Sequence, residues 1–267
     1  MNNVNKTLYI PLYGKAYVSK KGIILQDKKA EAIWDSEGFE LKSKSKSKWL
    51  AYYMGMRSAV FDNWLTDCMQ SDFGAVILHI GCGLDSRIYR VGSTVHTWFD
   101  IDFPEVIAER KKFYQSTNTY CMLSSDIREK SWIDAIPQHQ KAIVVMEGVS
   151  MYMQQSELIL LLKRLTDYFE EVRILLDCYT TFAAKASKHK NPINDVGVTE
   201  VFGIDDPLLL AEGTGLDFVC EHEMTPSSMI NQLKGMEKII FKIVYGGSMA
   251  KKMYRLYEYK SSKKKQI

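Results

Sequence analysis

The chain has 267 residues, 46% of them apolar and 25% charged, with a formal net charge of +3. This length allows one large domain or two small ones, with a core that needs no disulfides. The small net charge gives no argument for nucleic acid as a partner. Five scattered cysteines without a Cys-x-x-Cys pair favour a reducing compartment, and we expect the cytoplasm and no metal site. We find neither a signal peptide nor an apolar run of the ~18 residues that would cross a bilayer, so we expect no membrane partner.

The N-terminal part of the chain, residues 1–72, is predicted to be a helical cap. Residues 49–69 carry apolar side chains at helical spacing and precede a break at 71–74. The run KSKSKSK at 42–48 predicts a solvated loop, because alternating lysine and serine cannot bury one face.

The rest of the chain alternates short apolar runs with helical segments. Apolar runs without alternation are typical of parallel strands buried on both faces, and their alternation with helices predicts a doubly wound α/β fold. We predict five parallel strands and two closing antiparallel ones, with an α/β core at 73–260 in a single domain that spans 1–267. The predicted strands are 75–80, 95–101, 119–125, 141–146, 172–179, 216–224 and 251–259, and the clearest helices are 104–114 and 155–168.

Two glycines follow the first predicted strand in LHIGCGLDSR (78–87). Gly81 and Gly83 lack side chains, so a ligand can approach the backbone at the carboxyl end of the sheet, where ligands bind in such folds. The dinucleotide fingerprint G-x-G-x-x-G is incomplete, because Ser86 occupies its sixth position. The motif alone is therefore compatible with a structural turn.

Acidic residues follow the next three strands. Asp100 and Asp102 lie about twenty residues beyond the glycines, where a carboxylate accepts hydrogen bonds from a ribose diol. The alternative is that Asp102 caps a helix that begins near Pro104. Asp126 and Glu147 follow the third and fourth strands. This set favours S-adenosylmethionine, a cationic nucleoside without phosphate, over a nicotinamide dinucleotide.

Four motifs in one order make the chain recognisable. IGCGLDSRIYR, WFDIDFPEVI, SSDIREKSW and MEGVSMYM resemble the leucine carboxyl methyltransferase superfamily, most closely its bacterial branch of tetracenomycin polyketide O-methyltransferase-like proteins. The resemblance runs roughly from residue 12 to residue 217. It implies a class I methyltransferase fold, a Rossmann-like sheet of seven strands, with S-adenosylmethionine as cofactor.

The resemblance also implies a role for each of seven cofactor-binding residues. Arg57 would bind the methionine carboxylate through its planar fork, for which the alternative is an ion pair on a helix surface. The remaining six would line the cofactor, hold the ribose, flank the adenine and approach the methionine end: they are Gly81 and Gly83, Asp102, Asp126 and Ile127, and Glu147 in that order. Arg87 would form a structural ion pair.

The expected activity is methyl transfer to a hydroxyl or carboxyl oxygen of a small-molecule acceptor. The alternatives are methylation of a protein C-terminal carboxyl, or a non-catalytic module that binds S-adenosylmethionine. A carboxylate needs no general base, whereas a phenol benefits from one. The candidates for a catalytic role are Tyr152 and His189, and neither is identified as the base. His79 is expected to be a satisfied core group, and Tyr13, Tyr17 and Tyr179 are candidates for shaping the acceptor pocket.

Overall fold

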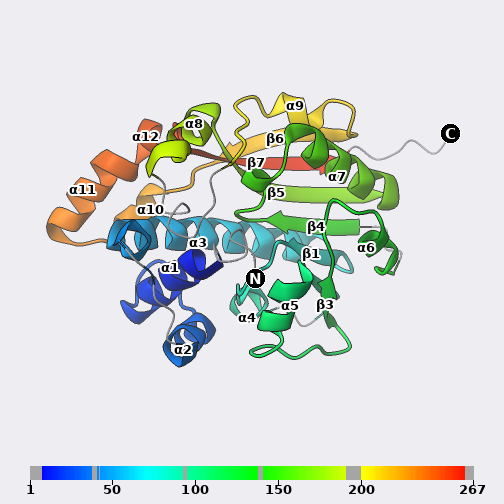
Figure 1. Ribbon diagram of the computed structural model, residues 1–267, viewed down its shortest axis with the longest axis horizontal. Helices are drawn as coiled ribbons and strands as arrows, with labels where there is room; N and C mark the ends of the chain where they lie inside the picture. Colours follow the sequence, from blue (N-terminus) through cyan, green and yellow to red (C-terminus); the bar gives the residue numbers. More distant parts are fainter. Residues whose placement is uncertain are drawn as a thin grey trace.

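The computed structural model describes residues 8–37, 41, 43–92, 95–137, 141–190 and 200–261, without the side chains of residues 37, 43, 44 and 188–190. Its strands form a seven-stranded sheet in the order β3-β2-β1-β4-β5-β7-β6 (Figure 1). The first five strands in this order pair in parallel, and β7 runs antiparallel to both of its neighbours. The predicted fold class and the antiparallel pair at one edge are confirmed.

All seven predicted strands are present, with small shifts at their ends. The strand at 141–146 begins and ends where predicted, whereas the second begins three residues later, at Trp98. Its pairing with Ile77 on one side and Tyr120 on the other begins only there. The strands are β1 (Val76–Ile80), β2 (Trp98–Asp102), β3 (Tyr120–Ser124), β4 (Lys141–Met146), β5 (Glu171–Tyr179), β6 (Leu216–His222) and β7 (Tyr254–Ser261).

Helices cover both faces of the sheet. None of the helices in the described ranges has the length and apolar character needed to cross a membrane. The longer ones are α1 (Tyr9–Lys20), α2 (Lys28–Glu37), α3 (Lys48–Ser71), α5 (Pro104–Arg110), α7 (Gln155–Tyr168), α8 (Thr181–Lys190) and α11 (Gly235–Tyr245). The short ones are α4 (Arg87–Val91), α6 (Ser131–Asp134), α9 (Leu208–Ala211), α10 (Ser227–Ile230), α12 (Gly247–Lys251), and the 3₁₀ turns η2 (Ser43–Lys46) and η3 (Ser150–Tyr152).

The described part of the lysine–serine run is more ordered than predicted. Residues 43–46 form the turn η2, in which Ser45 is fully buried. Ser47 then caps α3, because its side-chain oxygen accepts a hydrogen bond from the backbone N–H of Trp49 at 3.3 Å. Ser47 thus satisfies a backbone donor at a helix start, which a composition argument does not capture.

Alternate residues of the strands face two separate cores. Ile77 and Val145 face a cluster that includes residues of α1 and α3, whereas Val76 and Val144 face a cluster that includes residues of α6 and α7. The period of two in a strand produces this division. Helix α3 thus packs directly on the sheet, and the division into a cap at 1–72 and a core at 73–260 stays a proposal.

Candidate active site

A cavity of about 760 Å³ opens at the carboxyl ends of β1, β2, β4 and β5. Its walls include the segments that follow these strands and parts of α1, α3, α11 and α12. Figure 1 shows α8, α11 and α12 gathered at this end of the sheet. The volume falls within the range of roughly 300–1,000 Å³ typical of small-ligand sites.

The glycine turn after β1 forms one wall of the cavity. Gly81 has a φ of +67° and donates its N–H to the carbonyl of Ile101 at 2.8 Å. A Cβ at this position would lie 2.2 Å from a methyl carbon of Val149. Gly83 has a φ of +50° and donates its N–H to Asp102 at 2.8 Å. The first glycine is therefore required for both conformation and space.

The two acidic residues of β2 have different roles. Asp100 is fully buried and accepts hydrogen bonds from Arg110, from Tyr120 at 2.5 Å and from the indole of Trp98 at 2.8 Å. The same Arg110 donates to the carbonyl of Gly83 at 2.9 Å, so the Asp100–Arg110 ion pair helps to fix the glycine turn. Asp102, in contrast, lines the cavity.

Asp102 does not cap the helix that follows it. Helix α5 begins at Pro104 with Phe103 as its cap and no side-chain cap bond. The carboxylate accepts N–H groups from Gly83 and from Phe103, each at 2.8 Å. Burial raises the pKa of Asp102 to about 6, although these two N–H groups act to lower it. Further hydrogen-bond donors from a ligand would stabilise the ionised form.

Glu147, directly after β4, joins two buried arginines. Arg57 donates through Nε to Glu147 at 3.0 Å and through Nη1 to Asp177 at 2.8 Å, and Arg87 donates to the other oxygen of Glu147. Burial alone would raise the pKa of Glu147, but the two guanidinium groups hold it at about 2. Arg57 is thus a buried residue and not part of a helix-surface ion pair.

The Arg57 guanidinium also faces the cavity. Within the described part of the chain its hydrogen bonds use Nε and Nη1, which leaves Nη2 for a ligand. Gly148 lies against the guanidinium, since a Cβ there would be 3.5 Å from Nη1 and Nη2. Its N–H is bound by Asp177 at 2.6 Å, so strand β5 fixes the position of both groups.

His79 is a satisfied core group, as predicted. Its Nδ1 lies 3.1 Å from Asp100 and its Nε2 lies 3.1 Å from Arg87. A carboxylate only accepts and a guanidinium only donates, so the ring carries its proton on Nδ1. Burial lowers the pKa of His79, with Arg87 acting in the same direction and Asp100 opposing them. The predicted ion pairing of Arg87 is also confirmed, through Asp62, Asp85 and Glu147.

The remaining predicted residues line the cavity or have side chains outside the described part of the structure. Asp126 and Ile127 both line the cavity, and Arg128 pairs with Asp126 at 2.5 Å and lowers its pKa. Tyr152, on η3, lines the cavity as well. The side chain of His189 lies outside the part that the structure describes.

Three neighbouring tyrosines line the cavity, and sequence reasoning missed two of them. The rings of Tyr53, Tyr179 and Tyr254 pack edge-on, with Tyr179 and Tyr254 4.4 Å apart between centroids. The buried hydroxyl of Tyr53 has no hydrogen-bond partner among the described residues. Of the three, the sequence analysis names Tyr179 alone, while Tyr13 packs on Trp34 and is not among the described residues that line this cavity. The tyrosines come from α3, β5 and β7, and no local sequence signal unites them.

The sequence matches the family model of leucine carboxyl methyltransferases over residues 6–166. It is 26% identical over 245 residues to the tetracenomycin polyketide synthesis O-methyltransferase TcmP of Streptomyces glaucescens, covering 89% of each chain. It is 22% identical over 230 residues to the S-adenosyl-L-methionine-dependent methyltransferase dpfgK of Gibberella zeae, covering 78% of this chain and 77% of the other.

Solved structures show the same fold at low identity. A protein from Thermobifida fusca classed as a methyltransferase has a TM-score of 0.57 and 9% identity, covering 93% of this chain and 94% of its own. Magnesium protoporphyrin IX methyltransferase from Synechocystis, with bound S-adenosylhomocysteine, has a TM-score of 0.51 and 11% identity, covering 93% and 97%.

The sheet order and the family match define an S-adenosylmethionine-dependent methyltransferase of class I. More specifically, the chain belongs to the leucine carboxyl methyltransferase family. The resemblance drawn from the sequence motifs is confirmed.

Gly81→Ala is expected to destabilise the protein more than Gly74→Ala. Both glycines have a positive φ, of +67° and +82°, so both variants bear a left-handed strain of about 1–2 kcal/mol. A Cβ at Gly74 meets nothing within 4 Å, whereas at Gly81 it overlaps Val149. We expect a further loss of about 1–3 kcal/mol at Gly81, measured by urea unfolding. Equal losses would contradict this account, and Val149→Ala should partly restore Gly81→Ala.

Asp102→Asn is expected to change how stability depends on pH. Since the pKa of Asp102 is about 6 in the folded protein and 3.8 is its ordinary value, the folded state takes up a proton first as pH falls. The wild type should therefore gain about 2 kcal/mol over the variant between pH 7.5 and pH 4.5, measured by urea unfolding. Asp126→Asn is the matched control and should show no such gain, because the pKa of Asp126 is lowered. The same trend in both variants would refute the assignment.

Proposed function

We propose that this methyltransferase transfers the methyl group to an oxygen atom of a small, largely apolar acceptor. The observation that carries the cofactor half of the proposal is Asp102. Its carboxylate ends β2, accepts the N–H of Gly83, and lines a cavity large enough for a nucleoside. Its raised pKa is the property expected of a carboxylate that awaits further donors, such as a ribose diol.

The residues present fit the cofactor at each of its ends. The proposed adenine contacts are Asp126 and Ile127, beyond β3, and the proposed ribose contact is Asp102. Gly81 and Gly83 provide a wall without side chains. Arg57 is the proposed partner of the methionine carboxylate through its remaining Nη2, while Glu147 contributes negative charge near the cationic end.

S-adenosylmethionine supplies an electrophilic methyl group on a positively charged sulfur. The chain itself supplies orientation and exclusion of water. Buried ion pairs hold Arg57 and Glu147 in one arrangement, so these groups need little rearrangement when a ligand binds. Holding two reactants in position contributes up to about 7–11 kcal/mol in favourable cases.

The tyrosine and methionine side chains that line the cavity favour an acceptor with apolar or aromatic surface. The side chains of Tyr53, Tyr179 and Tyr254 face it together with Met249 and Met253 of the α12 region. The unpartnered Tyr53 hydroxyl is a buried donor that an acceptor oxygen would satisfy. An acceptor with a flat ring and an oxygen substituent matches both properties.

The described cavity offers no available imidazole base. His79 is the histidine that lines it, and both of its ring nitrogens are engaged. Burial raises the pKa of Tyr53, with neighbouring tyrosines and Asp177 adding to the effect and Arg57 opposing it, so its phenol stays protonated. A carboxylate acceptor, which is ionised by itself at neutral pH, needs no proton transfer to either of these groups.

S-adenosylhomocysteine should bind the purified full chain in isothermal titration calorimetry, whereas NAD should not. Protonation of Asp102 removes an acceptor for the ribose, so affinity should fall about tenfold from pH 7.5 to pH 5. Asp102→Asn should weaken binding at pH 7.5 by at least about tenfold and abolish this pH dependence. Binding that is unaffected by the substitution would refute the ribose assignment.

Methyl transfer should be faster to aromatic carboxylic acids than to the matched phenols at pH 7. The rate with an acid should be nearly flat between pH 7 and pH 9, whereas the rate with a phenol should rise as the phenol ionises. Product formation is measured with methyl-labelled cofactor, and a peptide with a free C-terminal carboxyl is included in the panel. Faster methylation of phenols with a flat pH profile would contradict the carboxylate preference. Methylation of the peptide alone would overturn the small-molecule proposal.

A further inference from the structure

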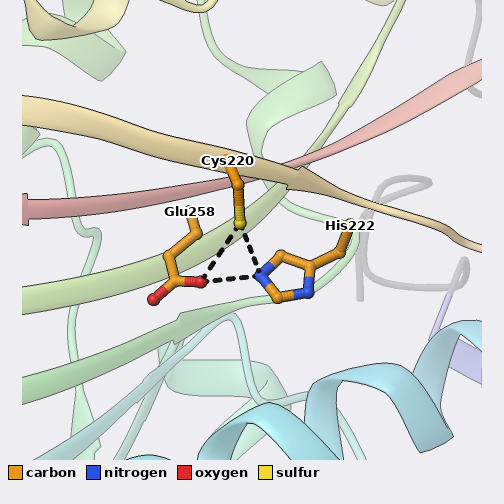
Figure 2. A group of neighbouring side chains, drawn as sticks. All are labelled: Cys220, His222 and Glu258. Atoms are coloured by element: carbon orange, nitrogen blue, oxygen red, sulfur yellow. Dashed lines mark hydrogen bonds and ion pairs between the residues drawn. The ribbon is translucent and has the colours of Figure 1, made fainter.

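Three potential metal ligands meet at the far edge of the sheet. Cys220 and His222 lie on β6, and Glu258 lies on β7. Their ligand atoms are close to one another: Sγ of Cys220 is 3.5 Å from Nε2 of His222 and 3.6 Å from Oε2 of Glu258, and Nε2 is 2.7 Å from Oε2. Figure 2 shows the ligand atoms of the three side chains pointing toward one another.

An irregularity in β6 creates this arrangement. From Phe218 to Cys220 strand β6 advances two residues, while β7 advances only one, from Tyr259 to Glu258. Side chains alternate along a strand, so the extra residue turns Cys220 to the face opposite Phe218. The ring of Phe218 packs on Tyr259, whereas Cys220 now stands beside Glu258. Without the bulge, Cys220 and His222 would point to the other side of the sheet.

The spacing matches a tetrahedral Zn²⁺ site. With a Zn–S bond of about 2.3 Å and a Zn–N bond of about 2.0–2.1 Å, tetrahedral geometry places S about 3.5 Å from N or O, and N about 3.3 Å from O. The two separations that involve Cys220 already have these values. Only His222 and Glu258 must move apart, by about 0.6 Å from their 2.7 Å contact.

An arginine outside the cluster orients the carboxylate of Glu258. Arg173 donates to Oε1 of Glu258 at 3.3 Å, which leaves Oε2 directed at the cluster. Such an outer contact orients a metal ligand and is typical of built sites. Glu258 is largely buried, while Cys220 and His222 are open to solvent on one side, which gives an entry path for the ion.

We propose that Cys220, His222 and Glu258 bind one Zn²⁺ ion, with water as the fourth ligand. Coordination forms a bond from Sγ to zinc and releases the thiol proton to solvent, while the imidazole and the carboxylate each donate a lone pair. None of the three residues is among the described residues that line the cavity, so the inference does not depend on methyl transfer. The ion would tie the edge strand β6 to β7. Sequence analysis did not predict this site, because Cys-x-His completed by a glutamate 36 residues later matches no usual metal-ligand spacing.

The test is metal binding by the full chain after removal of metals with a chelator. Zn²⁺ is titrated in competition with a chromophoric chelator, and Co²⁺ is titrated as a spectroscopic probe. We expect one ion per chain, a thiolate-to-cobalt charge-transfer band with tetrahedral d–d bands, and a higher unfolding temperature with Zn²⁺. Cys220→Ser and His222→Ala should each weaken Zn²⁺ binding more than about tenfold.

Cys121→Ser provides the matched control, because Cys121 is a partly exposed cysteine on β3 at the opposite edge of the sheet. It should leave the affinity, the cobalt spectrum and the thermal shift unchanged. Circular dichroism of each variant without metal verifies that it is folded. Equal Zn²⁺ affinity in Cys220→Ser and Cys121→Ser, or a cobalt spectrum without the charge-transfer band, would overturn the proposal.

Discussion

The rest of the site depends on one buried carboxylate, Glu147, between two arginines. Arg57 comes from the N-terminal helix α3 and Arg87 from α4, which follows β1, so this contact joins both helices to the end of the central strand β4. All three side chains are almost inaccessible to water. Removing one member of such a group leaves an uncompensated buried charge, which typically costs about 3–5 kcal/mol. The positions of Arg57 and Glu147 in the cavity wall are therefore fixed before any ligand binds.

The buried charges continue beyond Glu147 in an alternating chain. Arg87 also contacts Asp85, which pairs with Lys15 of α1 at 3.4 Å, while Asp177 completes the other end through Arg57. The basic neighbours lower the pKa of Glu147 and of Asp85 against the opposing effect of burial. Asp102 stands outside this network: among the described residues its hydrogen-bond donors are the backbone N–H groups of Gly83 and Phe103, and burial raises its pKa, whereas the arginines lower that of Glu147. The ion pairs thus fix the charged groups of this network, and both Arg57 and Asp102 line the cavity, where a ligand can reach them.

Local sequence signals predicted the sheet well. The run KAIVVM is buried on nearly every residue and pairs on both sides, so its hydrophobicity alone defines β4. Asp102 could be placed at the cavity because its position follows from the strand end and from the glycine spacing. These predictions rest on residues near one another in the chain.

Contacts between distant segments could not be predicted. Arg57 and Glu147 are 90 residues apart, and the acid Asp177 lies within an apolar run that reads simply as a strand. A buried acid in such a run signals a paired charge, but it does not name the partner. The bulge at β6 leaves no mark in the sequence either, because it is defined by the register against β7. The helices and strands could therefore be predicted from the sequence, whereas the contacts between them could not.

Part of the cavity wall comes from one segment of the chain, the residues between β6 and β7. Helices α10 to α12 lie between β6 and β7 in the sequence. Because these two strands pair with each other, the segment that holds the helices leaves and rejoins the sheet at neighbouring strands. Its members Tyr245 and Met249 face the cavity, while the glycine turn, Asp102 and Glu147 lie on β1 to β4 or just beyond them. The segment between β6 and β7 therefore adds wall to a cavity whose glycine turn, Asp102 and Glu147 belong to the sheet. Because Phe241 of this segment is fully buried against Tyr52 of α3, any change to its cavity-facing residues has to preserve the packing that anchors it.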